Sequence, residues 1–440
     1  MRRDAHLTTA LTILTLLFFS ATREARAQSD DAPKAEVGVQ FTSLSLTPPE
    51  DFLGTENKPG FGARFTYNLT DSVAVEAEGN FFPTKSRPGI SVGGRASQLQ
   101  AGVKAGKRFE KFGVFFKARP GFVSFDDALQ IDAEQISIDQ TPFLIPRVTR
   151  VRRTHFSMDV GGVLELYPTR RTMLRFDAGD TIIRYGERND FDSFPLVPAL
   201  TRAPSEVKHN FQFTAGVGYR FGGGEDGGPG AGAADDVPDG TRKFEVGVQF
   251  SSLGLNEPDR SFGGGVIFGG LGVNTEAGFG ARLGYNFNEH VAVEAEGNFF
   301  PRRRFSDTTQ GGYPVQLQAG AKVGRRFERF GLFFKARPGF VGFTDVLELE
   351  RVETAIFGGE PFPFPVFSSH WKNYFSMDLG GVFEVYPTRR VLARFDFGDT
   401  IIRYGQRRDF GFFGGQFVEF NLPSETKHNF QFTAGLGYRF

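Results

Sequence analysis

The sequence predicts an all-β protein, a transmembrane up-and-down antiparallel β-barrel present as two tandem eight-stranded modules. Three observations carry this prediction: an internal repeat, period-2 segments of membrane-spanning length, and connections that alternate between short and long. Composition agrees, because 53 Phe and 56 Gly beside one Trp and 4 Met suit a lipid-facing sheet better than a helical core. Past the N-terminus, no segment approaches the roughly 20 apolar residues of a spanning helix, so only a barrel would cross a membrane.

The first residues are typical of a secretory signal peptide. Arg2 and Arg3 precede an apolar run from Leu7 to Phe19, and Ala25-Arg26-Ala27 forms a small-x-small cleavage motif. The run has about 13 residues, which is too short for a spanning helix. We therefore expect residues 1–27 to be a cleaved signal peptide, with an uncleaved anchor helix as the alternative.

The rest of the chain is one module written twice. Four stretches recur: 36–41 at 245–250, 73–83 at 291–301, 117–122 at 335–340 and 208–216 at 427–435. A stretch rich in Gly, Asp and Ala separates the copies and is typical of a flexible linker. The sequence predicts a first barrel module at 28–221, a Gly-rich periplasmic linker at 222–241 and a second barrel module at 242–440.

Each copy contains eight segments in which apolar and polar residues alternate. Their lengths are close to the roughly 9–11 residues that a transmembrane strand needs. In the first copy they lie at about 35–46, 60–69, 73–83, 97–108, 112–125, 154–167, 172–186 and 207–221. Short turns near 70–71, 110–111 and 168–170 alternate with long loops near 47–59, 84–96, 126–153 and 187–206. Short periplasmic turns and long outer loops are the pattern of outer-membrane barrels.

The strand count also permits one sixteen-stranded barrel, which is the alternative architecture. Two separate barrels are favoured because the copies are joined by about 20 linker residues and not by a tight turn. The first copy also has its own complete terminal strand, which ends at Phe221. Finally, a near-balanced set of inward charges suits a filled lumen better than a water-filled one.

The ends of the two copies are their most specific feature. Residues 211–221 read FQFTAGVGYRF and residues 430–440 read FQFTAGLGYRF, with Phe432, Tyr438 and Phe440 in phase. With these strands, each module resembles the OmpA-like family of eight-stranded outer-membrane barrels over essentially its whole length. The resemblance implies a place in the bacterial outer membrane and an assembly signal, formed by these three aromatic residues, for the barrel-assembly machinery. A secreted β-sandwich or a lipocalin-like barrel is the globular alternative.

Strand parity predicts which residues fill the lumen, because Arg or Lys facing mid-membrane lipid costs about 2–4 kcal/mol. The predicted lumen charge network of the first copy is Glu36, Arg64, Glu76, Glu78, Lys104, Arg108, Lys117, Arg119, Asp159, Glu165, Arg175, Asp177 and Arg220. The second copy repeats each sign at Glu245, Arg282, Glu294, Glu296, Lys322, Arg326, Lys335, Arg337, Asp378, Glu384, Arg394, Asp396 and Arg439. An eight-stranded barrel is just wide enough for side chains to fill it, so the near-matched set predicts a salt-bridged plug. A conduction path lined by the same residues is the alternative.

Catalytic and metal sites find little support. The segment His155-Phe156-Ser157 resembles the His-x-Ser pair of lipid A deacylases, but the second copy has Tyr374-Phe375-Ser376, and parity turns Ser157 inward, away from lipid. His209 and His428 recur without a nucleophile at a convincing spacing. With no Cys and no two His at ligand spacing on one strand, we expect no enzyme activity, no metal and no cofactor. Lys+Arg and Asp+Glu balance at 51 each, which gives no reason to expect nucleic acid.

Two features allow more than one interpretation. Residues 176–186 return as 395–405; they form either an outer-rim patch in which Asp180 pairs with Arg184, or a kinked seventh strand in which Gly179 relieves crowding. The aromatic stretches at 357–367 and 410–417 are either exposed ligand-contacting loops or strands that extend past the membrane.

We expect a structural or surface-interaction role, with binding carried by the extracellular loops. A porin-like passive channel for small solutes or ions is the alternative. The expected partners are outer-membrane lipid and lipopolysaccharide, the barrel-assembly machinery and an extracellular ligand of the loops.

Overall fold

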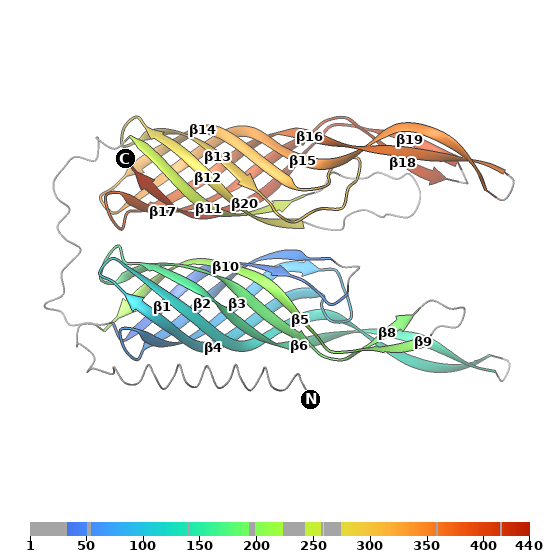
Figure 1. The fold of residues 1–440 in the computed structure, drawn as a ribbon, viewed down its shortest axis with the longest axis horizontal. Helices are drawn as coiled ribbons and strands as arrows, with labels where there is room; N and C mark the ends of the chain where they lie inside the picture. Colours follow the sequence, from blue (N-terminus) through green and yellow to red (C-terminus); the bar gives the residue numbers. More distant parts are fainter. Residues whose placement is uncertain are drawn as a thin grey trace, which may run out of the picture.

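The computed structural model describes residues 33–50, 54–138, 141–192, 199–222, 243–256, 258, 274–357, 360–413 and 416–440. The predicted signal peptide at 1–27 lies outside these residues, as does the predicted linker after Gly222. The described residues form antiparallel strands arranged as two barrels side by side (Figure 1). Within this part of the chain, no helix has the length and apolar character needed to cross a membrane.

The first barrel is a ring of eight antiparallel strands. They are β1 (Ala35–Leu46), β2 (Glu56–Asn68), β3 (Val73–Ser86), β4 (Gly94–Arg108), β5 (Phe112–Ile138), β6 (Thr141–Leu166), β7 (Thr172–Tyr185) and β10 (Glu206–Phe221). Each strand pairs with the next, and β1 closes the ring by pairing with both β2 and β10. Because closure satisfies the backbone of every strand, the ring has no open edge within the membrane.

The second barrel repeats this ring. Its strands are β11 (Phe244–Leu255), β12 (Asn274–Asn286), β13 (Val291–Phe299), β14 (Pro314–Arg326), β15 (Phe330–Phe357), β16 (Glu360–Val385), β17 (Val391–Tyr404) and β20 (Glu425–Arg439). Here β11 closes the ring with β12 and β20. A sixteen-stranded barrel would need β10 to pair with β11, whereas β10 pairs with β1 and β7. Among the described residues, one backbone pair, Asn57 with Thr275, joins the two rings.

The strands at the loop end are longer than expected. Residues 126–153 were expected to form a loop, but β5 and β6 continue as a paired hairpin beyond a register shift between Phe125 and Ala128. The aromatic stretch at 357–367 likewise belongs to the β15–β16 hairpin, so the strand-extension interpretation is the correct one there. Two further hairpins project at this end: β8 (Arg188–Asp192) with β9 (Ala199–Ala203), and β18 (Arg407–Phe413) with β19 (Gln416–Leu422) (Figure 1).

An exposed carboxylate anchors the second long hairpin at its base. Asp345 accepts hydrogen bonds from Ser369 of β16 and from Arg303 Nη2, the latter at 2.6 Å. The hydrogen bonds from Ser369 and Arg303 lower the pKa of Asp345 to about 2. The carboxylate is therefore ionised at neutral pH and holds the chain before β14 against β15 and β16.

The outer surface of the rings is apolar. Val39 is 62% exposed and Leu99 is 67% exposed, on faces that alternate with buried polar positions. Alternation of apolar outward and polar inward residues is expected when lipid surrounds the barrel. Gly179 fits this wall for a steric reason, because a Cβ there would lie 2.3 Å from the backbone oxygen of Val160. This contact supports the crowding explanation for the repeated motif at 176–186.

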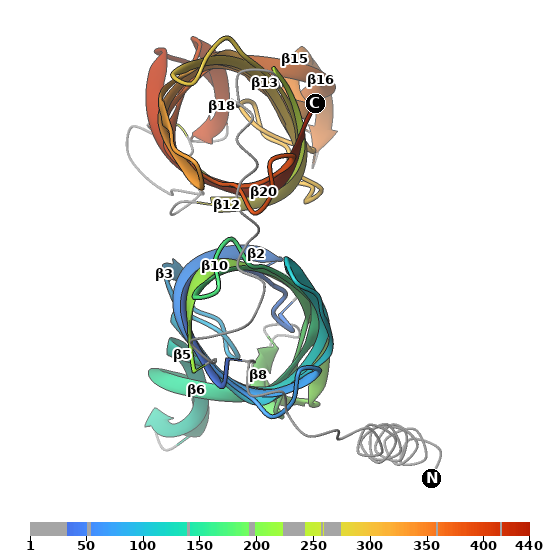
Figure 2. The ribbon, with the colours of Figure 1, turned by 90° about the vertical axis from the view of Figure 1, so that its left-hand side faces the viewer.

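The two barrels pack against each other through an aromatic seam on their outer faces. Its ring pairs are Phe41 with Phe432 at 3.9 Å, Phe213 with Phe250 at 4.1 Å and Phe176 with Phe395 at 5.7 Å between centroids. Phe176 is only 9% exposed and Ala215 only 2%, although both belong to the outward face. These side chains therefore contact protein, whereas most of their neighbours on that face would meet lipid. Figure 2 shows the two barrels side by side, viewed along their axes.

Candidate functional site

The lumen of the first barrel is built around two arginines. Arg119 on β5 donates to Glu78 and Asp159, each at 2.5 Å. Arg175 on β7 binds both carboxylate oxygens of Glu76 and donates from Nε to Asp177 at 2.6 Å. Both guanidinium groups are fully buried. A buried guanidinium with carboxylates on both sides has its charge compensated and its donors satisfied.

Two lysines complete this central layer. Lys117 lies 2.9 Å from Asp159 and 3.3 Å from Asp177. Lys104 bonds to Glu165 and lies 3.6 Å from Glu76. Four carboxylates each lie within ion-pair distance of more than one cation, so the layer is a network and not a set of separate pairs; they are Glu76, Asp159, Glu165 and Asp177.

The periplasmic end of the lumen is closed by a smaller cluster. Arg108 donates to Glu36 at 3.2 Å and to the Tyr167 hydroxyl at 3.2 Å. The guanidinium of Arg220 lies over the Tyr167 ring, 4.4 Å from its centroid, with its Nε 3.6 Å from Glu36. Arg64 differs from the other bases, because it donates a hydrogen bond to the amide oxygen of Gln40, at 2.9 Å, and not to a carboxylate.

The second barrel reproduces this arrangement contact by contact. Arg337 donates to Glu296 at 2.5 Å and to Asp378 at 2.9 Å, as Arg119 does to Glu78 and Asp159. Arg394 joins Glu294 to Asp396, as Arg175 joins Glu76 to Asp177. The corresponding partners of the remaining residues are Lys322 with Glu384, Lys335 with Asp378, Arg326 and Arg439 with Glu245, and Arg282 with Gln249.

The structure places all the predicted lumen residues on the inner face. They are Glu36, Arg64, Glu76, Glu78, Lys104, Arg108, Lys117, Arg119, Asp159, Glu165, Arg175, Asp177 and Arg220 in the first barrel, and Glu245, Arg282, Glu294, Glu296, Lys322, Arg326, Lys335, Arg337, Asp378, Glu384, Arg394, Asp396 and Arg439 in the second. All are buried except Arg108 and Arg326, which are partly exposed. Of the predicted assembly signal, Tyr438 and Phe440 are exposed on the outer face, while Phe432 is buried in the aromatic seam.

Above the charges lies a layer of side-chain amides that sequence reasoning missed. Asn80 accepts from Gln40 at 2.9 Å and donates to Gln98 at 2.8 Å, and Gln98 donates to Gln212 at 3.0 Å. The same chain of amides crosses the second barrel through Gln249, Asn298, Gln316 and Gln431. The signal was present as uncharged polar residues at inward positions, where only charged residues were sought.

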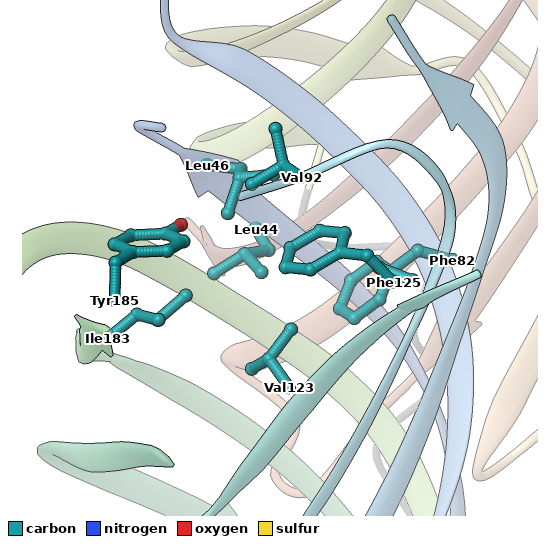
Figure 3. Packing of buried hydrophobic residues seen from close by; sticks show 9 residues of the cluster. Leu44, Leu46, Phe82, Val92, Val123, Phe125, Ile183 and Tyr185 are labelled. Carbon is teal, nitrogen blue, oxygen red and sulfur yellow. The ribbon is translucent and has the colours of Figure 1, made fainter. Parts of the chain in front are cut away.

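An apolar cap closes the loop end of the lumen and was also missed. In the first barrel it consists of Leu44, Leu46, Phe82, Val92, Ala96, Val123, Phe125, Ile183 and Tyr185, which point toward one another from several strands (Figure 3). The second barrel has an equivalent cap of Leu253, Leu255, Phe300, Val341, Phe343, Val346, Tyr374, Ile402 and Tyr404. The lumen therefore changes from charged to amide to apolar between its periplasmic end and its loop end.

The position of His155 explains its replacement by Tyr374 in the second copy. The Nε2 atom of His155 lies 2.8 Å from the backbone oxygen of Ser91, and the imidazole ring packs beside Tyr185. Tyr374 donates its hydroxyl to the backbone oxygen of Thr309 at 2.7 Å and packs beside Tyr404. Both rings attach an overlying loop to the cap through a hydrogen bond. This contact gives His155 a structural role.

Ser157 is buried beneath this cap, and its hydroxyl has no hydrogen-bond partner. We predict that Ser157→Ala leaves the free energy of unfolding of the purified protein unchanged, or raises it by about 1 kcal/mol at most, because no hydrogen bond is lost. Urea titration followed by far-UV circular dichroism measures this free energy. A loss of several kcal/mol would show that the hydroxyl is bonded.

A histidine that recurs in both copies bonds to a carboxylate on the outer face. His209 Nδ1 lies 2.5 Å from Asp180, which also accepts from the backbone N–H of Asn210 at 2.9 Å. His428 and Asp399 repeat this pair at 2.5 Å. The predicted pairing of Asp180 with Arg184 is therefore wrong, because Asp180 reaches the neighbouring strand β10 instead. Across the described ranges, no three His, Asp or Glu side chains gather in a way that would hold a metal ion.

Comparison with known proteins bears on these barrels directly. Residues 11–221 match the family described as outer membrane protein beta-barrel domain. Among curated proteins, no match was found.

Three solved structures illustrate the similarity. Neisserial surface protein A shares 12% identity, with 42% of this chain and 97% of that chain covered and a TM-score of 0.27. The N-terminal barrel of Pseudomonas aeruginosa OprF shares 16%, with 43% and 99% covered and a TM-score of 0.22. A Pseudomonas aeruginosa FadL homologue shares 11%, with 93% and 91% covered and a TM-score of 0.26.

These TM-scores are low, so the assignment of the fold rests on the strand pairing and on the family match. The pairing closes β1 to β10 into a ring, and the family match covers the residues of that ring. Residues 11–221 therefore match the outer membrane protein beta-barrel domain family, and the ring that they form is a β-barrel of the outer-membrane type.

Proposed function

We propose that this protein is a non-conducting barrel with a structural or surface-interaction role. The observation that carries the proposal is the filled lumen. The side chains of Lys104, Lys117, Arg119 and Arg175 have no surface that a water-sized sphere can touch. An apolar cap lies above them, so the first barrel is sealed at two levels.

The energetics favour a permanent plug. A conducting pore needs a continuous polar path that ions enter and leave easily. Here an ion would have to displace carboxylates that already share several buried cations, and breaking such a pair costs about 3–5 kcal/mol each time. The cap would add the cost of opening a packed apolar layer.

A passive channel is the second candidate, and one observation favours it. The side-chain amides of Gln100 and Gln318 occupy corresponding places in the two barrels, and neither amide has a hydrogen-bond partner. Recurrent unpaired polar groups in both lumens would suit a narrow polar path between the charge network and the cap.

Conductance separates the two candidates. We expect the full-length protein in planar bilayers to give no stable openings, while a general porin inserted in the same bilayers gives large ones. Stable openings of the wild-type protein comparable to those of the porin would overturn the plugged-barrel proposal and support the channel.

The interaction surface that we propose is the set of hairpins beyond the membrane. Phe364, Phe367 and Trp371 of β16 are exposed there, as is Ile356 of β15. Exposed apolar groups at this density are typical of a contact surface. We further propose that the protein is not an enzyme, that outer-membrane lipid and lipopolysaccharide surround its apolar band, and that Phe440 presents the terminal strand to the barrel-assembly machinery.

A further inference from the structure

The wall of the first barrel opens at one place near the outer rim. The pairing of β6 with β7 ends at Phe156 and Arg184, and β6 continues toward the long hairpin without β7 beside it. A cleft of about 660 Å³ lies at this opening. It is lined by residues 152–156 of β6, by Arg184 of β7 and residues 186–188 that follow β7, and by Ser91 and Ser205.

The cleft carries four arginines and one acidic side chain. Arg188 is buried and already paired, with Glu206 at 3.1 Å and Glu50 at 3.7 Å. The acidic residue, Glu187, is held by Arg202 at 2.5 Å. The local carboxylates are therefore engaged, and they leave the other arginines uncompensated.

Three guanidinium groups remain available to a ligand. Within the described residues, Arg152, Arg153 and Arg184 have no carboxylate within ion-pair distance, and Arg153 Nε is buried without a hydrogen-bond partner. Arg152 and Arg184 are exposed at the mouth of the cleft, while Arg153 lies deeper. Clustered guanidinium groups repel one another and present paired N–H donors that match the oxygen atoms of a phosphate.

The other wall of the cleft is apolar. Phe156 is 47% exposed and points outward at the upper limit of the apolar residues of β6, directly beside Arg184. A ligand in the cleft would thus meet cations above and a lipid-facing aromatic ring below. This combination fits an amphipathic molecule whose charged group lies at the membrane surface.

We propose that the first barrel binds the phosphate of an outer-leaflet lipid in this cleft, through Arg152, Arg153 and Arg184. The inference rests on the proposed surface-interaction role and gives it a ligand class. The phosphate enters between β6 and the chain after β7, and the acyl chains lie along the outer face past Phe156. Lipid and inorganic phosphate offer the same group to the arginines, but only lipid uses the aromatic wall.

The second barrel provides an internal comparison. A cleft of about 600 Å³ lies at the same end of the second barrel and is lined by Lys372, Arg407, Arg408 and Glu348 among others. Trp371 stands where the first barrel has Arg152. Arg407 is paired with Glu425 at 2.9 Å. The second barrel therefore lacks a counterpart of Arg152, and the proposal concerns the first barrel.

The experiment uses the full-length protein in detergent micelles and bisphosphorylated lipid A as the probe, with bound lipid counted by native mass spectrometry. The test variant carries Arg152→Gln and Arg184→Gln, and the matched control carries Arg95→Gln, an exposed rim arginine outside the cleft. We expect the test variant to bind lipid A at least about tenfold more weakly, because two charge-assisted contacts are lost. The control and Lys372→Gln should bind as the wild type does.

Three outcomes would overturn the proposal. They are equal binding by the test variant, equal binding of dephosphorylated lipid A, and displacement of lipid A by inorganic phosphate at a similar concentration, which would identify a free-anion site. Bilayer conductance of the same preparations tests the plugged barrel independently of lipid binding. Any of these three outcomes in a non-conducting protein rejects only the phosphate cleft, whereas stable openings of the wild-type protein reject the plugged barrel.

Discussion

Arg119→Met should lower the unfolding free energy of the first barrel by about 3–5 kcal/mol, because it leaves buried carboxylates without their cation. Arg119 contacts both Glu78 and Asp159, and none of the three is exposed to solvent. Methionine fills much of the same volume, so the loss is electrostatic more than steric. The urea midpoint of the refolded protein, read by its heat-modifiable migration in gels, measures the effect.

The matched control for this prediction is Arg64→Met. Arg64 is also buried, but it donates its hydrogen bond to Gln40 and not to a carboxylate. We expect a clearly smaller loss, since no carboxylate loses a direct bond. If both variants are equally stable, or if Arg64→Met is the worse of the two, the network does not stabilise the barrel through its ion pairs. Arg337→Met and Arg282→Met repeat the comparison in the second barrel.

Cysteines placed in the aromatic seam should crosslink the two barrels in nearly every folded molecule. The chain has no native cysteine, so Phe213→Cys with Phe250→Cys introduces the only thiols. The two rings lie 4.1 Å apart in the structure. A short bismaleimide should join them, and a protease site inserted into the linker reveals the joined halves as one band on a denaturing gel.

The control pair is Leu99→Cys with Leu317→Cys, which occupy corresponding strands of the two barrels and are both exposed. These thiols should react with a monofunctional maleimide but should not join the halves. Equal crosslinking of both pairs would mean that collisions and not a fixed seam bring the barrels together. Absence of crosslinking at Phe213 and Phe250, with both thiols reactive, would show that the barrels lie apart in the membrane.

Much of the barrel wall could be predicted because two environments act on alternate residues. Lipid on one side and a narrow lumen on the other impose period 2, and β1 runs from Ala35 to Leu46 as that alternation predicts. The same alternation assigned Arg119 and Glu78 to the lumen. Which carboxylate bonds to which base could not be predicted, since it depends on the stagger between strands that are distant in sequence.

Beyond the membrane this constraint disappears. Residues 141–153 of β6 include charged groups on the exposed face, such as Arg150 and Arg152, and no lipid penalises them there. The register shift after Phe125 further interrupts the pattern, so the β5–β6 hairpin was expected to be a loop. The seam could not be predicted for a different reason. Phe176 is buried against protein and Phe211 is partly exposed, but an outward position requires an apolar side chain whether it meets protein or lipid.

The seam also determines how the protein would hold a partner. Both barrels direct their long hairpins to the same end of the molecule (Figure 1). Once one barrel's hairpins are bound, the other set is confined nearby, so the second contact becomes an intramolecular event with a high effective concentration. A target that matches both sets would leave only when both contacts open together, and its residence time would therefore exceed that on either barrel alone.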